Sequence, residues 1–299
     1  MCSISTSVPL SRLSSANKPA INSALSHEAG WRCQGNLWSN LTDICHLLKM
    51  AAPIYEHEDE VLFQHVRFKA GQRIHTIGQH FDSLFIVNSG FLKTVLIDEY
   101  GSEQVLSFPM KGDLLGIDGI HNAHHASEAI ALSDCDIIVL PYKIFSALGH
   151  RYAELEQAMF SVMSRELVRE QTMIGMLSAL SAEAKVARFL INLADRFDQL
   201  GYSGKVFNLR MTRHEIGSYL GLTLETVSRT LSAFNELGFI TVEQRQISIL
   251  DVNALKTLRR LPPAKSRKQA AAQVTERVSA LVSKNLLPIW NKEVAPVLN

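Results

Sequence analysis

Short apolar runs alternate with glycine turns over residues 60–150. The turns fall at sequences such as Ala70-Gly71, Ser89-Gly90 and Lys111-Gly112-Asp113. Short strands separated by regularly spaced glycine turns are typical of an all-β roll or barrel. The expected strands are 61–68, 73–77, 84–87, 91–97, 105–108, 129–131 and 137–140.

A helical period replaces the strand pattern after Pro141, from about Arg151 to Leu180. Six positions there follow alternating spacings of three and four residues: Phe160, Met163, Leu167, Glu170, Ile174 and Leu177. This spacing forms an a/d seam, which predicts pairing with an identical helix. Packing of the same stripe on the protein's own roll is the alternative.

A third pattern fills residues 182–250. A helix is expected over 182–200, and a second should begin at Thr212-Arg213-His214-Glu215, which has the form of a capping box. Thr223 can cap a third helix over 224–237, closed by Gly238. Strands are expected at 239–242 and 246–250. Helix, glycine-containing turn, helix and hairpin together predict a winged helix-turn-helix.

The two helices of this motif should bury one face and expose the other. Side chains expected to pack inward are Ile216, Leu220, Val227, Leu231 and Phe234. Glu225, Ser228 and Arg229 then share an outer face, where a major-groove helix meets base edges. Arginine can donate to guanine and glutamate can accept from cytosine; a solvated i, i+4 pair is the alternative. The candidate DNA-binding residues are Thr212, Arg213, Thr223, Glu225, Thr226, Ser228 and Arg229.

Composition narrows the class of protein. The 299 residues are 46% hydrophobic and 20% charged, which suits a globular protein of two domains. The formal charge is +1, yet residues 252–299 hold nine Lys/Arg and two Asp/Glu, so the tail carries +7 and residues 1–251 carry −6. A basic tail beside a DNA-binding domain is expected to add phosphate contacts, although a solvated extension explains it nearly as well.

Motifs that are missing from the sequence bear on the expected cellular location of the protein and on whether it is an enzyme. No apolar run is long enough to cross a bilayer, and the serine-rich start has no apolar core of a secretory signal. The four cysteines are too few and scattered for a disulfide scaffold, so we expect a cytoplasmic protein without a membrane segment. The motifs G-x-S-x-G, H-E-x-x-H and the Walker loop are missing, so no enzyme is expected.

Residues 211–242 resemble the DNA-reading segment of the CRP/FNR superfamily, and Glu225-x-x-Ser228-Arg229 resembles its FNR branch. The similarity extends to Phe68-Lys69-Ala70-Gly71, Ser89-Gly90 and Gly112-Asp113-Leu114-Leu115-Gly116, and covers roughly 60–255. The resemblance implies a cyclic-nucleotide-binding-like jelly roll, a dimerising helix and a winged helix that recruits or blocks RNA polymerase. It also implies a homodimer on double-stranded DNA with palindromic, TTGAT-like half-sites.

Members of this superfamily bind different effectors and cofactors, and the residues that bind each of them can be compared with this sequence. Members that bind cyclic AMP balance its phosphate with an arginine, and the matching stretch 116–128 contains none, so cyclic AMP is not expected. FNR-type [4Fe–4S] clusters use a tight N-terminal cysteine group and one cysteine in the roll. Cys45 matches the last N-terminal ligand, but Cys33 is twelve residues away and the roll position falls on Ile138. Cys2, Cys33, Cys45 and Cys135 would therefore need a new geometry to hold a cluster.

Other roles for these side chains stay open. Cys33 and Cys45 suit a thiol switch, but for each cysteine a small buried hydrophobe is the favoured interpretation. His121, His124 and His125 suit haem or a metal, but a plain loop feature of the FNR branch is favoured. The sequence thus leaves the cofactor unknown, as well as activation versus repression.

The combined prediction is an α+β protein: an N-terminal antiparallel β-roll, a long dimerisation helix and a C-terminal winged helix-turn-helix. The expected segments are a partly disordered extension at 1–57, a sensor roll at 58–150, the helix at 151–180, the DNA-binding domain at 181–255 and the basic tail at 256–299. The predicted function is sequence-specific transcription regulation, with oxygen or redox state as the candidate signal. The alternative is a ligand- or protein-binding roll whose helix pair does not read DNA.

Overall fold

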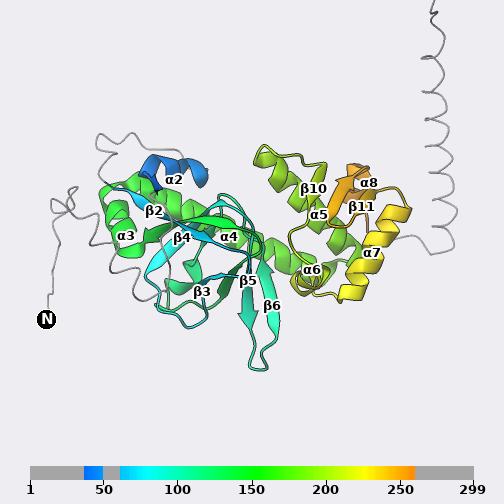
Figure 1. The fold of residues 1–299 in the computed structure, drawn as a ribbon, viewed down its shortest axis with the longest axis horizontal. Coiled ribbons are helices and arrows are strands. Elements are labelled where there is room, and N and C mark those ends of the chain that lie inside the picture. Colours follow the sequence, from blue (N-terminus) through cyan, green and yellow to red (C-terminus); the bar gives the residue numbers. More distant parts are fainter. Residues whose placement is uncertain (1–36, 50–60, 260–299) are drawn as a thin grey trace, which may run out of the picture. The chain divides into compact units, whose positions relative to one another are not determined.

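The computed structural model describes residues 37–49 and 61–259 of the chain (Figure 1). The chain divides between Met173 and Ile174 into two compact units, and this division falls inside helix α4 (Ala153–Ala179). The first unit carries two sheets and most of α4, and the second carries further helices with a small sheet. No helix in the described ranges is long and apolar enough to span a membrane.

Two antiparallel sheets form the roll of the first unit. One has the strand order β1-β2-β9-β4-β7 and the other β3-β8-β5-β6. The predicted antiparallel β-roll is therefore confirmed. Its strands are β1 (Trp38–Ser39), β2 (Phe63–Phe68), β3 (Arg73–His75), β4 (Ser83–Ser89), β5 (Leu92–Ile97), β6 (Glu103–Ser107), β7 (Leu114–Leu115), β8 (Glu128–Ala131) and β9 (Cys135–Pro141).

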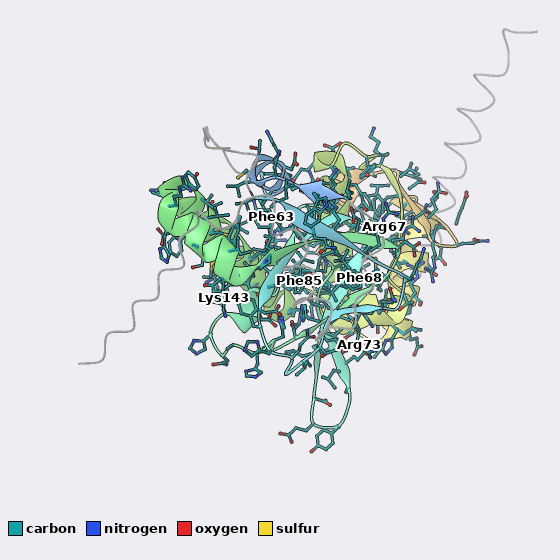
Figure 2. All side chains as sticks on the ribbon, turned by 60° about the vertical axis from the view of Figure 1, so that its left-hand side comes forward. Phe63, Arg67, Phe68, Arg73, Phe85 and Lys143 are labelled. Atoms are coloured by element: carbon teal, nitrogen blue, oxygen red, sulfur yellow. The ribbon has the colours of Figure 1, made fainter. Side chains whose placement is uncertain are left out.

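The central strand β9 shows why the roll needs two apolar clusters. Successive side chains of a strand point to opposite faces of its sheet. Ile137 and Val139 join an inner cluster with Phe85 of β4, which Figure 2 labels, and the second sheet contributes residues such as Leu92. Ile138 and Leu140, on the opposite face of β9, belong instead to an outer cluster that the helices cover. A strand buried on both faces carries a run of apolar residues, as β9 does from Ile137 to Leu140.

Three helices of the first unit share the outer cluster. They are α2 (Leu41–Leu47), α3 (Tyr142–Arg151) and the N-terminal part of α4. Helix α3 was not predicted, and neither were β1 and α2, which fall within the expected extension at 1–57. A signal for α2 exists in the sequence, because Asn40 and Asp43 form a capping box at its start.

Gly90 explains the Ser89-Gly90 motif. Its φ is +100°, and a Cβ there would lie 2.5 Å from Sγ of Cys135 and 2.7 Å from the carbonyl oxygen of Asp134. Only glycine combines that backbone conformation with so close an approach. The motif is therefore required by the packing of the turn on the start of β9.

The second unit contains the predicted winged helix-turn-helix. Helix α5 (Ala182–Gln199) precedes α6 (Arg213–Leu220) and α7 (Leu224–Glu236), and a three-stranded sheet has the order β10-β12-β11. Strands β11 (Ile240–Glu243) and β12 (Gln246–Ile249) form the expected hairpin. The structure also contains two elements that the sequence did not predict, strand β10 (Val206–Asn208) and helix α8 (Val252–Thr257).

Candidate DNA-binding interface

Helix α6 begins with the predicted capping box. The backbone N–H of Glu215 donates to Oγ1 of Thr212 at 3.2 Å, and the N–H of Thr212 donates to the Glu215 carboxylate at 2.7 Å. Gly217 allows the turn that follows, because a Cβ on it would lie 2.6 Å from the carbonyl oxygen of Leu222. Cap and turn together fix where α7 begins.

Helix α7 has the two faces that the sequence predicts. Val227 and Phe234 are fully buried, and Leu231 is buried beside them, as are the two expected core residues of α6. Thr223 caps the helix by accepting from the backbone N–H of Thr226 at 3.1 Å. The buried stripe therefore holds α7 against the body of the domain and leaves the other side of the helix outside.

The outer face of α7 carries the predicted base-reading residues. Glu225 and Arg229 are exposed, and Thr226 and Ser228 are half-buried. In the described part of the chain neither Glu225 nor Arg229 enters an ion pair. The alternative of a Glu–Arg pair along the helix is therefore not seen. Both charged groups are free to meet an outside partner.

Arg213, the first residue of α6, is a further cation among the predicted DNA-binding residues. Its guanidinium is half-buried, and one of its terminal nitrogens, Nη1, is buried without a hydrogen-bond partner. Burial lowers the pKa of Arg213 below its ordinary value, although a guanidinium stays protonated near neutral pH. Because Nη1 is buried, only the exposed part of the Arg213 side chain can meet an outside phosphate.

The predicted dimer seam lies on the outer side of α4. Phe160, Leu167 and Ile174 are 64%, 55% and 66% exposed. Leu155 and Val162 are almost fully buried in the outer cluster, so the helix contacts its own roll through a different face. The structure thus does not support the alternative in which the seam packs on the roll. Met163 and Leu177 are half-buried, and Glu170 is exposed.

The two cysteines that the structure describes lie in different apolar clusters of the first unit. Cys45 of α2 is fully buried in the outer cluster, whereas Cys135 belongs to the inner cluster, where its thiol contacts the carbonyl oxygens of Phe91 and Ser133. Burial raises the pKa of the Cys135 thiol, which suits a small buried hydrophobe. Cys2 and Cys33 lie outside the described residues. Cys45 and Cys135 are thus not brought together in one ligand set, and we derive no chemistry through a cluster.

The three loop histidines also separate. His124 is exposed and meets His80 edge to face, and His121 is exposed, whereas His125 is buried and stacks on His75. Within 37–49 and 61–259 no three side chains of His, Cys, Asp or Glu are placed to hold a metal ion. His121 and His124 thus lie exposed, whereas His125 belongs to the roll interior.

Comparison with known proteins agrees with this architecture. Residues 65–152 match the model of the cyclic nucleotide-binding domain, and residues 184–258 match that of the Crp-like helix-turn-helix domain. The transcriptional regulatory protein btr of Bordetella pertussis is 37% identical over 218 residues, which is 73% of this chain and 90% of that protein. The chain belongs to the CRP/FNR family of transcription regulators.

Further members share this level of similarity. The electron transport regulator A of Shewanella oneidensis is 38% identical over 72% of this chain and 86% of its own length. The fumarate and nitrate reduction regulatory protein of Escherichia coli K12 is 37% identical over 72% and 88%. FixK2 of Bradyrhizobium japonicum has the same fold, with a TM-score of 0.62 and 22% identity over 68% of this chain and all of that one.

The interior of this CRP/FNR roll holds a polar group that sequence reasoning missed. The rings of His75 and His125 stack with centroids 4.0 Å apart, and both residues are buried. Asp118 lies beside them, 3.5 Å from Nδ1 of His125, and accepts from the backbone N–H and hydroxyl of Ser127 at 2.7 Å. Burial acts to raise the pKa of Asp118, but the bonds from His125 and Ser127 hold it well below its usual range.

A buried glutamate pairs with an arginine between β3 and β8. The carboxylate of Glu128 is almost fully buried in β8, and Nε of Arg73 donates to it at 2.6 Å. Arg73 is therefore already paired with an internal anion. The effector of the roll stays a question for experiment, and the absence of cyclic AMP stays a prediction.

We expect His75 to make the roll less stable in mild acid. Burial, then the neighbouring His125, lowers the pKa of His75 from 6.5 to about 4. The unfolded chain binds this proton more readily, so folding stability falls as pH drops from about 6.5 to about 4, by roughly 3 kcal/mol. Urea unfolding of the wild type and His75→Phe at pH 7 and pH 4.5 measures this. Equal losses in both proteins would show that His75 is not the cause.

Proposed function

We propose that this regulator binds double-stranded DNA as a homodimer at a palindromic site with TTGAT-like half-sites. The observation that carries the proposal is the outer face of α7, where Glu225 and Arg229 are exposed beside the half-buried Ser228 and form no ion pair within residues 37–49 and 61–259. These residues match the reading pattern of the FNR branch. Thr212, Arg213, Thr223 and Thr226 lie at the starts of α6 and α7, where they support contacts to the DNA backbone.

The dimer half of the proposal rests on α4. Three large apolar side chains stand exposed along one side of it, at the seam positions 160, 167 and 174. Exposed apolar stripes on a helix mark contact with a partner, and heptad spacing favours an identical helix. Two copies joined in this way present two α7 helices, which is what a palindrome requires.

The regulatory setting is also a proposal. We infer that the roll at 58–150 senses a signal, that helix 151–180 passes it on, and that the domain at 181–255 acts with RNA polymerase at promoters. Oxygen or redox state is the signal we favour, because two relatives bear the names electron transport regulator and fumarate and nitrate reduction regulatory protein. The basic tail beyond residue 259 lies outside the described residues.

Arg229→Ala tests base reading. Because a bidentate arginine–guanine contact is specific to one base pair, we expect a loss of about 1–3 kcal/mol on the palindrome and a relaxed preference at that pair. The matched control is Arg245→Ala, at the exposed turn between β11 and β12, which should weaken binding to all duplexes alike. Fluorescence anisotropy with palindromic and scrambled duplexes measures both. An equal loss on the two duplexes would make Arg229 a phosphate contact only.

Glu170→Ala tests control of the dimer. A two-fold axis through the seam would bring Glu170 close to its copy, and two carboxylates at an apolar interface repel and lose hydration. In the described residues Glu170 makes no ion pair. We expect the substitution to tighten the dimer by about tenfold, whereas Gln171→Ala leaves it unchanged. Sedimentation over a concentration series measures the constant, and a weaker or unchanged dimer would end the role of Glu170.

A further inference from the structure

Four strands of one sheet bring four polar side chains together in the first unit. Ser39 of β1 pairs in register with Phe63 of β2, and His65 lies two residues further along β2. Asp136 of β9 and Asn88 of β4 come from the neighbouring strands of the same sheet. Ser39 and His65 are 26 positions apart, and His65 and Asp136 are 71, so only the folded roll assembles the group.

These side chains form one chain of hydrogen bonds. Oγ of Ser39 lies 2.8 Å from Nε2 of His65, and Nδ1 of His65 lies 2.8 Å from Oδ2 of Asp136. Nδ2 of Asn88 donates to the same carboxylate oxygen at 2.7 Å. Burial acts to raise the pKa of Asp136, but the bonds from His65 and Asn88 lower it, so the group is a carboxylate at neutral pH.

The carboxylate fixes the roles of the other two groups. An ionised Asp136 only accepts, so Nδ1 of His65 carries a hydrogen and donates it, and in the neutral imidazole Nε2 carries none. Nε2 is then left with a lone pair, which accepts from the hydroxyl of Ser39. This is the order of groups in which an imidazole takes the proton of a hydroxyl as its oxygen attacks an electrophile.

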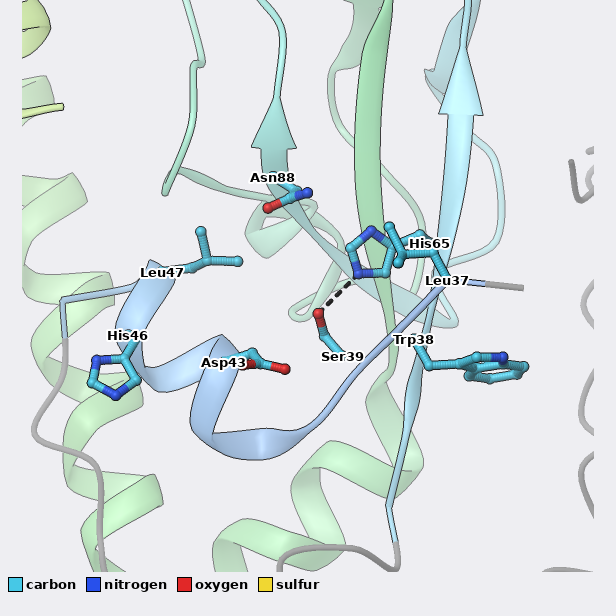
Figure 3. A pocket seen from close by; sticks show the side chains of 8 residues that line it. All are labelled: Leu37, Trp38, Ser39, Asp43, His46, Leu47, His65 and Asn88. Carbon is cyan, nitrogen blue, oxygen red and sulfur yellow. Dashed lines mark hydrogen bonds between the residues drawn. The ribbon is translucent and has the colours of Figure 1, made fainter. Parts of the chain in front are cut away.

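A cavity gives the hydroxyl room to react. It has a volume of about 280 Å³ and is lined by Ser39, His65 and Asn88 together with residues of α2 and β1 (Figure 3). Leu37, Trp38 and Leu47 supply apolar wall, and Asp43 and His46 supply polar wall. Ser39 and His65 are themselves 8% and 7% exposed, so their hydrogen bond is largely shielded from water. The size suits a short acyl group better than a peptide.

We propose that Ser39 is a nucleophilic modification site that takes a short acyl group from an activated ester, with His65 as its general base and Asp136 as the positioning residue. Oγ of Ser39 attacks the carbonyl carbon and forms the new C–O bond, while its proton passes to Nε2 of His65. The bond from that carbon to the leaving alkoxide or phenoxide breaks, and His65 returns the proton to the leaving group. The product is O-acyl-Ser39 and the free alcohol or phenol.

The test is acetylation of the full chain by p-nitrophenyl acetate. Release of p-nitrophenol is followed by absorbance, and the modified serine is located by mass spectrometry of peptides. We expect one rapid equivalent of p-nitrophenol per chain and acetyl on Ser39, with the exposed Ser102 as the internal reference for an unassisted hydroxyl. Ser39→Ala should remove the rapid phase.

Two further variants separate activation from a purely structural hydrogen bond. His65→Gln lacks the base and should slow acetylation of Ser39 by about 100-fold or more. Asp136→Asn can still bond to the imidazole but favours the other tautomer, so the rate should fall while thermal unfolding of the roll changes little. Should either variant fail to fold, the wild-type ratio of Ser39 to Ser102 labelling decides alone. Equal labelling of the two serines, or an unchanged rate in folded His65→Gln, would overturn the proposal. The hydrogen bonds of Ser39, His65 and Asp136 would then only hold β1 in place.

Discussion

Replacing Phe234 by alanine is expected to unfold the winged helix domain in part and to abolish tight DNA binding. Phe234 is fully buried in α7, with its ring 6.2 Å from that of Phe239. Removing a buried phenylalanine costs about 3–5 kcal/mol, because the cavity closes only in part. Small domains are stable by only about 5–15 kcal/mol in total. The loss should lower the thermal midpoint of this unit by about 12 °C or more.

Ser232→Ala is the matched control on the same helix. Ser232 is exposed, and exposed substitutions usually change stability by less than about 0.5 kcal/mol. Differential scanning calorimetry of the three proteins measures the transition, and anisotropy measures binding to the palindrome. A Phe234→Ala protein with an unchanged midpoint would show that α7 is not held by its buried stripe.

Replacing Leu167 by glutamate is expected to give a monomer with at least about 100-fold weaker binding to the palindrome. Leu167 is 55% exposed, so the change should not disturb the fold of the single chain. In a dimer the new carboxylate would lie near Glu170, and both groups would also face their copies on the partner helix. These negative charges repel across the seam. Losing one of two linked half-site contacts weakens binding by about 10²–10⁴-fold.

Thr172→Glu is the control for added charge on α4. Thr172 is exposed but off the seam, and its hydroxyl donates to the carbonyl oxygen of Val168. It should leave both the dimer and DNA binding nearly unchanged. Sedimentation and anisotropy on the same samples separate the two effects. A dimeric Leu167→Glu protein would show that the seam has been placed on the wrong side of the helix.

The winged helix was predictable because its signals are local. Thr212 and Glu215 cap α6 from within one turn, and Thr223 caps α7 in the same manner. The apolar positions of both helices follow the helical period, so the burial of Val227 and Phe234 follows from spacing alone. Which side chains of these helices face inward or outward can therefore be predicted from the local sequence, without knowing any contact with a distant part of the chain.

Other features depend on contacts that no short pattern contains. Strand β7 has two residues, too few for an alternating pattern, and β1 is equally short. The stack of His75 on His125 arises because β3 pairs with β8, whose residues lie more than fifty positions away. The Ser39–His65–Asp136 relay likewise depends on the register of β1, β2 and β9. Of these residues only His125 was singled out from the sequence, because the others meet their partners only in the folded roll.

The most direct test of DNA reading by a dimer is equilibrium binding of the wild-type protein to three duplexes of equal length. One carries two TTGAT-like half-sites as a palindrome, one has a single half-site scrambled, and one has both scrambled. We expect two chains on the palindrome, with affinity falling by about 100-fold or more when one half-site is scrambled. Equal affinity for all three at physiological salt would contradict sequence-specific reading and favour a roll whose helix pair serves another partner.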